Sequence, residues 1–258
     1  VEGPPPIYEL YEKYNIKPLK RLLEIAKDSG VKHAVILGSY FAYFDRVWTD
    51  LQLYRTHPYI RSRVDQATMA LSFAGGGMDV SVLELPYIFG AQPGRKPVWV
   101  FLVEQIQKMK GATFYPAGGT TMVTVKQVGQ CIAGALERGR GGKNYPIGYY
   151  NLTWKEMLTI MHRHMGLSGR KVITIPPFLY RQALKPVLRE HEKKGIQSGL
   201  DLMGLVKIMT RKAFIDQETA VQELGVEADD IDRAIGESVK LSMEILDGRR
   251  QTITMKGE

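Results

Sequence analysis

Tyr59 and Arg63 are the residues whose types and spacing most directly suggest chemistry. They follow Pro58, a residue suited to the first turn of a helix. Residues four apart face the same side of a helix, so the phenol and the guanidinium are expected to lie close together. A fixed cation favours the ionised form of a neighbouring phenol, which suits tyrosine to general acid–base catalysis. An ordinary surface helix carrying the same two residues is the alternative interpretation.

The composition is that of a soluble globular protein with one large domain or two small ones. The 258 residues are 44% hydrophobic and 24% charged, and a chain of this length buries a substantial core. The net charge of +8 comes from 35 Lys and Arg against 27 Asp and Glu. Such a surface attracts anions, and nucleotide cofactors, nucleotide sugars and nucleic acid all qualify.

Cysteine use and hydropathy favour a cytoplasmic protein. Cys131 is the single cysteine, so no internal disulfide forms, and its neighbours are typical of a buried helix face rather than a catalytic thiol. No apolar run reaches the roughly 18 residues of a membrane span, and the first residues do not resemble a signal peptide. We therefore expect no membrane partner.

Hydrophobic periodicity predicts alternating helices and strands in the first half. A helix over 7–28, interrupted at Pro18, precedes a buried strand over 32–38. An irregular stretch over 39–56 is expected next, then a helix over 58–74 and a strand over 79–85. Strand, helix and strand in this order predict a βαβ unit and an α/β fold with a Rossmann-like, doubly wound parallel sheet.

The pattern becomes mostly helical in the second half. The predicted elements are a helix over 98–109, a strand over 112–116, a helix over 124–138, a strand over 144–148, and helices over 153–165, 177–192, 200–212, 217–224 and 229–247. We therefore expect a Rossmann-like dinucleotide-binding domain over 1–150, incomplete at its N-terminus, and a smaller, mostly helical substrate-binding domain over 151–258.

Five segments resemble, in the correct order, motifs of the extended short-chain dehydrogenase/reductase family, the NAD-dependent epimerase/dehydratase group. They are Tyr-Asn-Ile-Lys-Pro at 14–18, the strand with Leu-Gly-Ser-Tyr-Phe-Ala-Tyr at 37–43, Tyr59-x-x-x-Arg63, Leu-Pro-Tyr-Ile-Phe-Gly at 85–90, and Phe-Ile-Asp with Glu-Leu-Gly within 214–225. The resemblance extends over nearly the whole chain and implies the family's fold and an NAD- or NADP-dependent activity.

The resemblance implies four catalytic residues. Ser39 would hydrogen-bond the substrate oxygen, and Tyr59 would donate or accept the proton. Arg63 takes the place of the family's lysine, which stabilises the phenolate and holds the nicotinamide ribose. Asn15 matches the asparagine that fixes a water in the family's proton relay.

The same resemblance implies cofactor and substrate contacts. The implied cofactor-binding residues are Leu37, Gly38, Tyr59, Arg63, Pro86, Tyr87 and Ile88, and the implied substrate-binding residues are Ser39, Tyr40, Phe41 and Tyr87. The aromatic run from Tyr40 to Trp48 either lines a pocket for an apolar or ring-shaped molecule or packs onto the sheet. The helical part after residue 150 is expected to close over the substrate.

The sequence departs from the family pattern in two places. Arg63 keeps the positive charge of lysine, but its planar guanidinium cannot act as a compact ammonium in a proton relay. The glycine-rich turn that holds a pyrophosphate between a strand and a helix is absent from these residues. We expect the chain to begin inside the fold, without about two βα units of about 30 residues each. Lys126 and Gln127 stand where many sugar-modifying relatives carry acidic residues, which weakens a nucleotide-sugar assignment.

Two functions therefore stay open. The first is an NAD(P)-dependent oxidoreductase or epimerase that transfers hydride at a secondary alcohol or ketone of a small molecule. The second is a non-catalytic relative that binds a dinucleotide or nucleic acid as a sensor or scaffold, although nucleic acid is not the partner we expect. By resemblance, the helices over 7–28 and 58–74 would form a homodimer interface. His162 and His164 point about 200° apart on a helix, so no metal site is expected.

Overall fold

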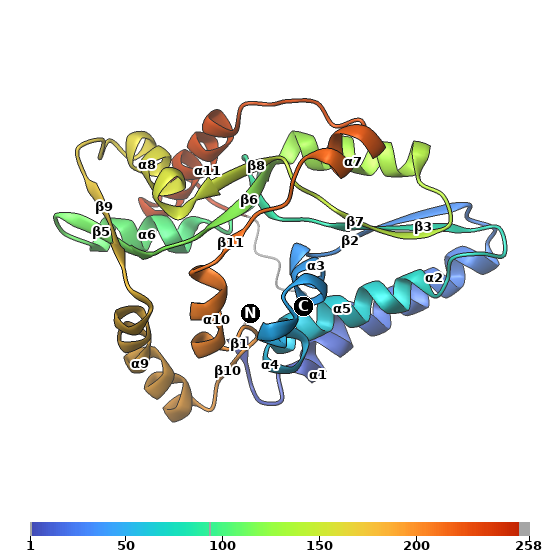
Figure 1. Ribbon diagram of the computed structural model, residues 1–258, viewed down its shortest axis with the longest axis horizontal. Helices are drawn as coiled ribbons and strands as arrows, with labels where there is room; N and C mark the ends of the chain where they lie inside the picture. The colour runs from blue at the N-terminus through green and yellow to red at the C-terminus, as the bar shows by residue number, and fades with distance from the viewer. Residues whose placement is uncertain (1, 93, 253–258) are drawn as a thin grey trace.

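A three-stranded parallel sheet organises one half of the molecule (Figure 1). Its strands are β2 (His33–Leu37), β3 (Asp79–Glu84) and β7 (Gly142–Pro146), in the order β2–β3–β7. The structure is a computed structural model and describes residues 2–92 and 94–252. Leu37 lies opposite Leu83, and Leu83 lies opposite Tyr145. The central strand is almost wholly buried, as in a sheet covered on both faces.

Helices cover both faces of this sheet. One face carries α2 (Lys17–Asp28) and α5 (Pro58–Leu71), and the other carries α7 (Val125–Arg138) (Figure 1). On the first face Leu23 and Ala70 pack against Val80, and on the second Cys131 packs near Leu83. The expected α/β arrangement with a parallel sheet is therefore confirmed.

The long helix predicted over 7–28 is three consecutive helical segments. They are α1 (Tyr8–Tyr11), the π-helix η1 (Glu12–Ile16) and α2. Pro18 lies in the first turn of α2, directly after η1, and has no backbone N–H to continue the helical hydrogen bonds. The predicted interruption at this proline is thus a change in helix type rather than a break.

The prediction of an irregular stretch over 39–56 is wrong. Residues here form α3 (Tyr40–Val47), the 3-10 turn η2 (Thr49–Leu51) and α4 (Leu53–Thr56). Ser39 is the N-cap of α3, and its hydroxyl accepts a hydrogen bond from the backbone N–H of Phe41 at 3.4 Å. Helix α3 buries Tyr40, Phe41 and Phe44 together. Because aromatic residues occupy consecutive positions here, the sequence shows no helical period.

A buried ion pair fastens α3 to the end of β3. Arg46 donates to both carboxylate oxygens of Glu84, at 2.7 and 2.6 Å. The Glu84 side chain is completely buried, whereas that of Arg46 is 45% exposed. Burial raises the pKa of Glu84, and the Arg46 guanidinium opposes that rise. The geometry is bidentate, which is the strongest arrangement for this kind of pair.

The second half of the molecule contains six shorter strands among the described residues, and the sequence predicted only the one over 112–116. A mixed sheet joins β6 (Gly119–Thr124) to β4 (Tyr87–Phe89), β8 (Tyr150–Thr153) and β11 (Lys212–Ala213). Separately, β5 (Ala112–Pro116) pairs with β9 (Lys171–Ile175). Strand β6 is fully buried although three of its six residues are threonines, and their hydroxyls find partners within the fold. Its polar sequence therefore gave no strand signal.

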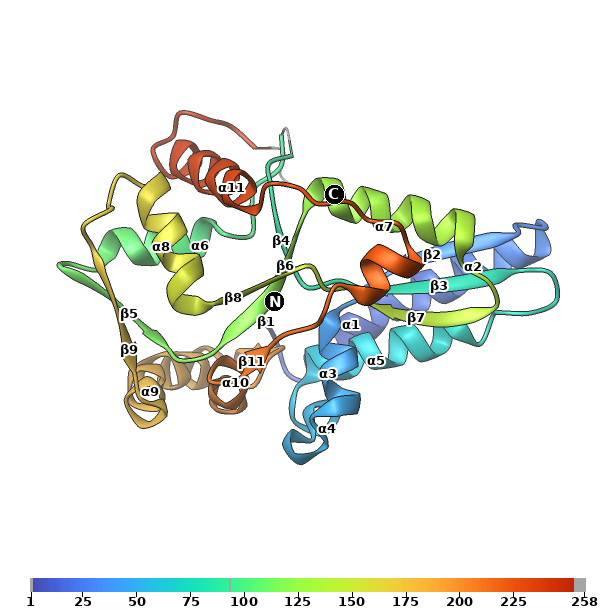
Figure 2. The same ribbon diagram turned by 45° about the horizontal axis from the view of Figure 1, so that its top comes forward.

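Three helices cover these strands: α6 (Val100–Lys108), α8 (Trp154–His164) and α11 (Ile231–Leu246) (Figure 2). Their shared core includes Phe89, Trp99, Met122 and Trp154. It draws on residues from both sides of position 150, where the domain boundary is expected. That boundary stays a prediction.

The remaining described elements complete the fold. They are α9 (Pro177–Lys194), α10 (Leu202–Met209), the pair β1 (Glu2–Gly3) with β10 (Gln197–Ser198), and the π-helix η3 (Thr219–Glu223). In Figure 1, α10 and β1 lie between the α3–α5 side and the α6–α9 side.

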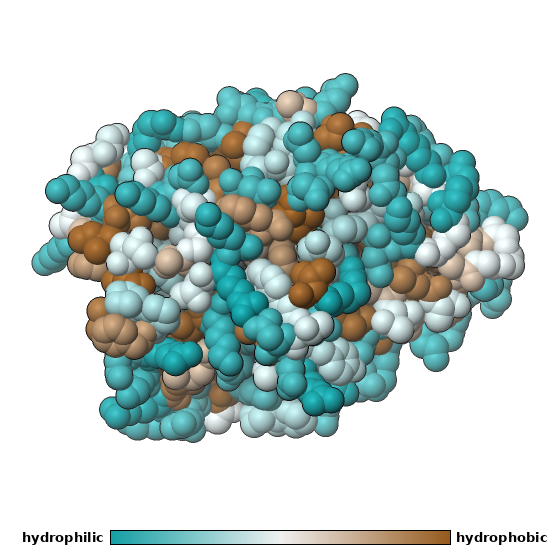
Figure 3. Space-filling view, in the orientation of Figure 1, coloured by the Kyte–Doolittle hydropathy of each residue, from teal (hydrophilic) through white to brown (hydrophobic). Residues whose placement is uncertain are grey.

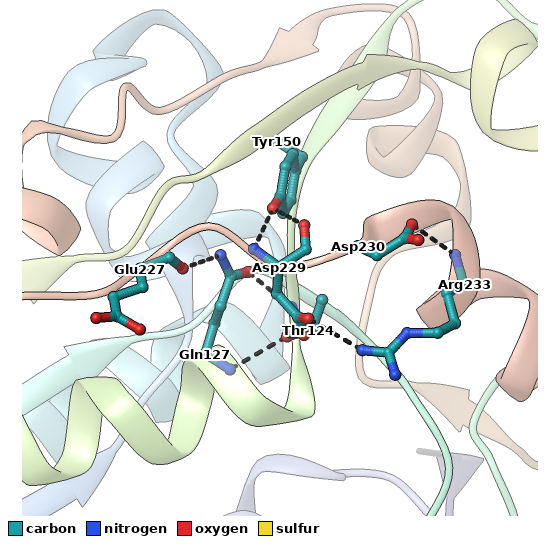
Figure 4. A network of polar contacts seen from close by, with 7 residues as sticks. All are labelled: Thr124, Gln127, Tyr150, Glu227, Asp229, Asp230 and Arg233. Atoms are coloured by element: carbon teal, nitrogen blue, oxygen red, sulfur yellow. Dashed lines mark hydrogen bonds and ion pairs between the residues drawn. The ribbon is translucent and has the colours of Figure 1, made fainter.

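A polar network joins the start of α7 to β8 and the segment before α11 (Figure 4). Thr124 and Gln127 form a capping box, and Gln127 also donates to the Glu227 carbonyl at 3.0 Å. The Thr124 hydroxyl donates to Asp229 at 2.7 Å, and the Tyr150 hydroxyl accepts from the Asp229 N–H at 2.9 Å. The Gln127 side chain therefore has a structural role in this network.

The exposed surface is mostly hydrophilic on the face in Figure 3, with hydrophobic residues in separate patches. Among the described residues, none of the helices has both the length and the hydropathy needed to cross a membrane.

The Arg46–Glu84 pair predicts a measurable loss of stability. Arg46→Met leaves a buried carboxylate unpaired, and we expect the free energy of unfolding to fall by about 2–3 kcal/mol, below the range for fully buried pairs because Arg46 is partly solvated. Lys108→Met, which removes an exposed pair with Glu104, should change it by less than about 0.5 kcal/mol. Urea unfolding measures both. Equal effects of the two variants would contradict the buried pair's role.

Candidate active site

A cavity of about 650 Å³ opens where β2 and β3 end. Its wall contains six of the residues singled out from the sequence: Phe41, Tyr59, Arg63, Pro86, Tyr87 and Ile88. The rest of the wall comes from β1, residues 98–101 and residues 198–205. The volume is in the range of small-molecule sites, and the carboxyl ends of parallel strands are where such sites form in α/β folds.

Tyr59 occupies the first turn of α5 and is held on several sides. Its backbone N–H donates to the Gly199 carbonyl at 2.7 Å. Its ring meets Tyr11 edge-on with centroids 5.9 Å apart, and Phe41 with centroids 6.3 Å apart. The Arg63 guanidinium carbon lies 5.3 Å from the ring centroid. The predicted proximity of phenol and guanidinium is therefore present in the structure.

Arg63 is tied to Asn15 through Gln66. The Arg63 Nη1 donates to Gln66 Oε1 at 2.8 Å, and Gln66 Nε2 donates to the backbone carbonyl of Asn15 at 3.3 Å. Asn15 lies in the π-helix η1 and takes part through its backbone. The Arg63 Nε is buried without a hydrogen-bond partner among the described residues. This orphan donor lies beside the cavity and is suited to an oxygen of a bound molecule.

Tyr11 adds a second phenol behind Tyr59 that the sequence reading did not single out. Its hydroxyl is also buried without a partner among the described residues. Burial raises the pKa of Tyr11, with Tyr59 adding to the rise and Arg63 opposing it. Its place in an amphipathic helix identified it only as a core residue.

Four other sequence-derived residues lie next to the cavity rather than in its wall. The Gly38 N–H donates to the Leu83 carbonyl at 2.8 Å, and Leu37 is half-exposed at the edge of the sheet. Ser39 is buried at the start of α3, and the Tyr40 hydroxyl hydrogen-bonds Thr120 at 2.9 Å. Their cofactor and substrate roles stay predictions.

The segment after β3 contributes an aromatic wall. Tyr87 packs against Tyr40 with ring centroids 6.0 Å apart and against Trp99 at 5.1 Å. Trp99 donates its Nε1–H to the Ile88 carbonyl at 2.9 Å, so the indole turns only apolar surface to other neighbours. Burial raises the pKa of Tyr87 far above its usual value, which keeps this phenol neutral and able to donate a hydrogen bond.

The His57 side chain fixes the segment that forms the opposite wall of the cavity. The sequence did not predict this role. The Asp201 N–H donates to His57 Nδ1 at 2.9 Å, just beyond Leu200 in the cavity wall. A Cβ on Gly204 would lie 2.8 Å from the His57 ring, so α10 packs closely on this imidazole. Burial lowers the pKa of His57, and the Asp201 carboxylate opposes this. His57 is therefore a neutral acceptor near neutral pH.

The remaining candidate groups are occupied elsewhere in the fold. His162 Nε2 hydrogen-bonds Thr113 at 2.9 Å, whereas His164 pairs with Asp232 at 2.9 Å. Burial raises the pKa of the Cys131 thiol to about 12, so it is not a thiolate near neutral pH. Within the described part of the chain, no three His, Cys, Asp or Glu residues gather as metal ligands would.

Comparison with known proteins shows the fold. Neither protein-family models nor curated proteins gave a match. The crystal structure of gox2253 shares 18% identity over 95% of this chain and 76% of its own, with a TM-score of 0.69. A DesIV double mutant from Streptomyces venezuelae, a dTDP-glucose 4,6-dehydratase solved with NAD, shares 18% over 92% and 68%, with a TM-score of 0.59.

The Bordetella bronchiseptica enzyme WbmH, in complex with NAD+, shares 12% identity over 93% of this chain and 71% of its own, with a TM-score of 0.60. At these identities the similarity establishes a common Rossmann-like fold. The resemblance to NAD-dependent epimerases and dehydratases is thus confirmed at the level of the fold.

His57 predicts a pH-dependent contribution to stability. A folded-state pKa below the usual value of about 6.5 gives stability that is present above that pH and lost as pH falls through the folded pKa. His57→Asn keeps an acceptor oxygen near Nδ1 but cannot titrate. As the pH falls from 7 to 4, the unfolding free energy of the wild type should decrease more than that of His57→Asn. Parallel pH profiles in urea unfolding would contradict this.

Proposed function

We propose that this protein is an NAD(P)-dependent oxidoreductase or epimerase of the extended short-chain type, acting at a secondary alcohol or ketone. The observation that carries the proposal is the single cavity shared by Tyr59, Arg63 and the segment Pro86, Tyr87 and Ile88. The two solved relatives described with NAD support the choice of cofactor. Fold similarity alone does not assign an activity, so the proposal rests on the site.

The residues fit the nicotinamide–ribose end of the cofactor. Arg63 offers a buried donor without a partner, which suits a ribose hydroxyl, and Pro86 and Ile88 offer apolar surface to a ring. Among the described residues, no glycine-rich turn leads from a strand into a helix, so the site as described supplies no pyrophosphate cradle. When bound, the nicotinamide would accept or donate the hydride.

The protein's own groups would handle the proton and the substrate oxygen. Tyr59 would move the hydroxyl proton, with the Arg63 guanidinium 5.3 Å from the centre of its ring. Tyr87, a neutral phenol in the wall, would hydrogen-bond the substrate oxygen, a role the resemblance gives to Ser39. Arg63 would act by charge, because a guanidinium does not release a proton near neutral pH.

Arg63 also keeps the non-catalytic alternative open. Gln66 links Arg63 directly to Asn15, the two residues that the resemblance assigns to a relay through lysine and water. A protein that binds nicotinamide cofactor but turns over no alcohol or ketone would fit this alternative, that of a dinucleotide sensor.

Exposed apolar residues on α2 support a homodimer. Leu22 and Ile25 are 61% and 54% exposed, and three residues apart they share one side of the helix. Tyr14, in the preceding π-helix, is also exposed. Apolar groups gathered on one helix are typical of a protein–protein interface.

Tyr59→Phe is the direct test of the catalytic proposal. Loss of the hydroxyl should lower turnover of a secondary alcohol by about 10²- to 10⁴-fold, with cofactor affinity nearly unchanged. Tyr149→Phe, outside the cavity, is the matched control and should behave as wild type. Turnover that survives Tyr59→Phe would disprove the assignment of Tyr59. Cofactor binding without turnover in the wild type would favour the sensor.

The dimer is tested by introducing charge on α2. Leu22→Glu places a carboxylate in the proposed interface, so the protein should become monomeric in sedimentation velocity while retaining its helical circular dichroism. Leu136→Glu, on the half-exposed outer side of α7, is the control and should remain dimeric. A wild type that is monomeric at micromolar concentration would rule out the interface.

A further inference from the structure

Most of the cavity wall is apolar. Aromatic and aliphatic side chains from four segments form most of it, including Phe41, Trp99, Phe101, Leu200 and Leu205. Val98 and Phe101 are 68% and 52% exposed, so apolar surface continues to the outside of the molecule beside the cavity. Exposed apolar residues continuous with a cavity are typical of a site for an apolar ligand.

The polar groups along the rest of the wall are already engaged. Glu2 and Ser198 both contact His191, at 3.3 Å each. The Gly199 carbonyl accepts from the Tyr59 N–H, and the Trp99 N–H is bonded to Ile88. These contacts use part of the hydrogen-bonding capacity that the hydroxyls of a sugar would need.

The free polar groups gather around Tyr59. The Tyr59 and Tyr87 side chains line the cavity together, and within residues 2–92 and 94–252 the Arg63 Nε lacks a hydrogen-bond partner. A substrate oxygen placed here would meet the two phenols, and Arg63 would remain for a ribose oxygen of the cofactor. One carbonyl or hydroxyl oxygen on an otherwise apolar molecule could hydrogen-bond both phenols.

The wall is poorly suited to a nucleoside diphosphate. Arg63 is its one cation among the described residues, and the nucleotide would also have to share the cavity with the Glu2 carboxylate. Burying a diphosphate needs several donors or cations, because an unpaired buried charge is costly. Lys126 and Gln127 do not line the cavity, and Gln127 is committed to the capping network.

We propose that the substrate is an uncharged, largely apolar molecule with a single carbonyl or secondary hydroxyl, held with that oxygen at Tyr59 and Tyr87. This substrate class rests on the proposed function for its chemistry, whereas its recognition rests on the wall alone. It differs from the sugar-nucleotide substrate named for DesIV.

Binding of 4-tert-butylcyclohexanone and of UDP-glucose tests the proposal, by calorimetry with and without NADP. The ketone should bind at least tenfold more tightly than UDP-glucose under one of the two conditions. Phe101→Glu puts a charge in the apolar wall and should weaken ketone binding about fivefold to tenfold, as expected for loss of part of an aromatic contact. Phe114→Glu, on β5 and 48% exposed outside the cavity, should not weaken it.

The outcomes separate the two proposals. Ketone binding that Phe101→Glu weakens, without NADP-dependent reduction, would support the substrate class and disprove the proposed reaction. Preferential binding of UDP-glucose, with turnover, would overturn the substrate class and keep the reaction. No ketone binding under either condition, or equal effects of Phe101→Glu and Phe114→Glu, would overturn the apolar site.

Discussion

The parallel pairing of β2 with β3 is the constraint on which the rest of the site depends. The ladder ends with the Gly38 N–H on the Leu83 carbonyl, and the Tyr40 N–H then bonds the Leu85 carbonyl at 3.0 Å. These two bonds place the first turn of α3 beside the segment that follows β3. Because the strands run in the same direction, groups that follow each of them meet at one edge of the sheet.

From this edge, aromatic contacts extend through the wall. Phe41 meets Tyr59 on one side and Tyr40 on the other, and Tyr40 in turn meets Tyr87. Offset and edge-on aromatic pairs stabilise beyond their buried area, so α3, α5 and the turn after β3 hold one another in position. The buried Arg46–Glu84 pair adds a second link between α3 and β3. The phenol and the guanidinium of α5 therefore face a cavity with largely fixed walls.

Local patterns in the sequence were sufficient for the parts of the site that are themselves local. Tyr59 and Arg63 come together because residues four apart on a helix always share a face. Strand β2 was predicted closely from its nearly continuous apolar run, and β3 from its alternation of apolar and polar residues. The helix α3 was missed because its aromatics occupy consecutive positions and show no helical period. Strand β6 was missed because its buried threonines are polar in sequence.

The rest of the cavity could not be predicted from local pattern. Leu200 and Leu205 reach it because His57 and the Tyr59 N–H bind residues 199–201, contacts between segments more than a hundred positions apart. Likewise, Gln66 links Arg63 to Asn15 across two helices, so the asparagine implied by resemblance participates through its backbone. Tertiary contacts of this kind leave no periodic signal in the chain.

A crystal structure with NADP and 4-tert-butylcyclohexanone would test the central claim most directly, namely that cofactor and substrate meet in the cavity beside Tyr59. The account predicts the nicotinamide against Pro86 and Ile88, a ribose oxygen within hydrogen-bond distance of Arg63, and the ketone oxygen within hydrogen-bond distance of Tyr59 and Tyr87. Nicotinamide bound elsewhere, or a ketone whose oxygen points away from both phenols, would contradict it.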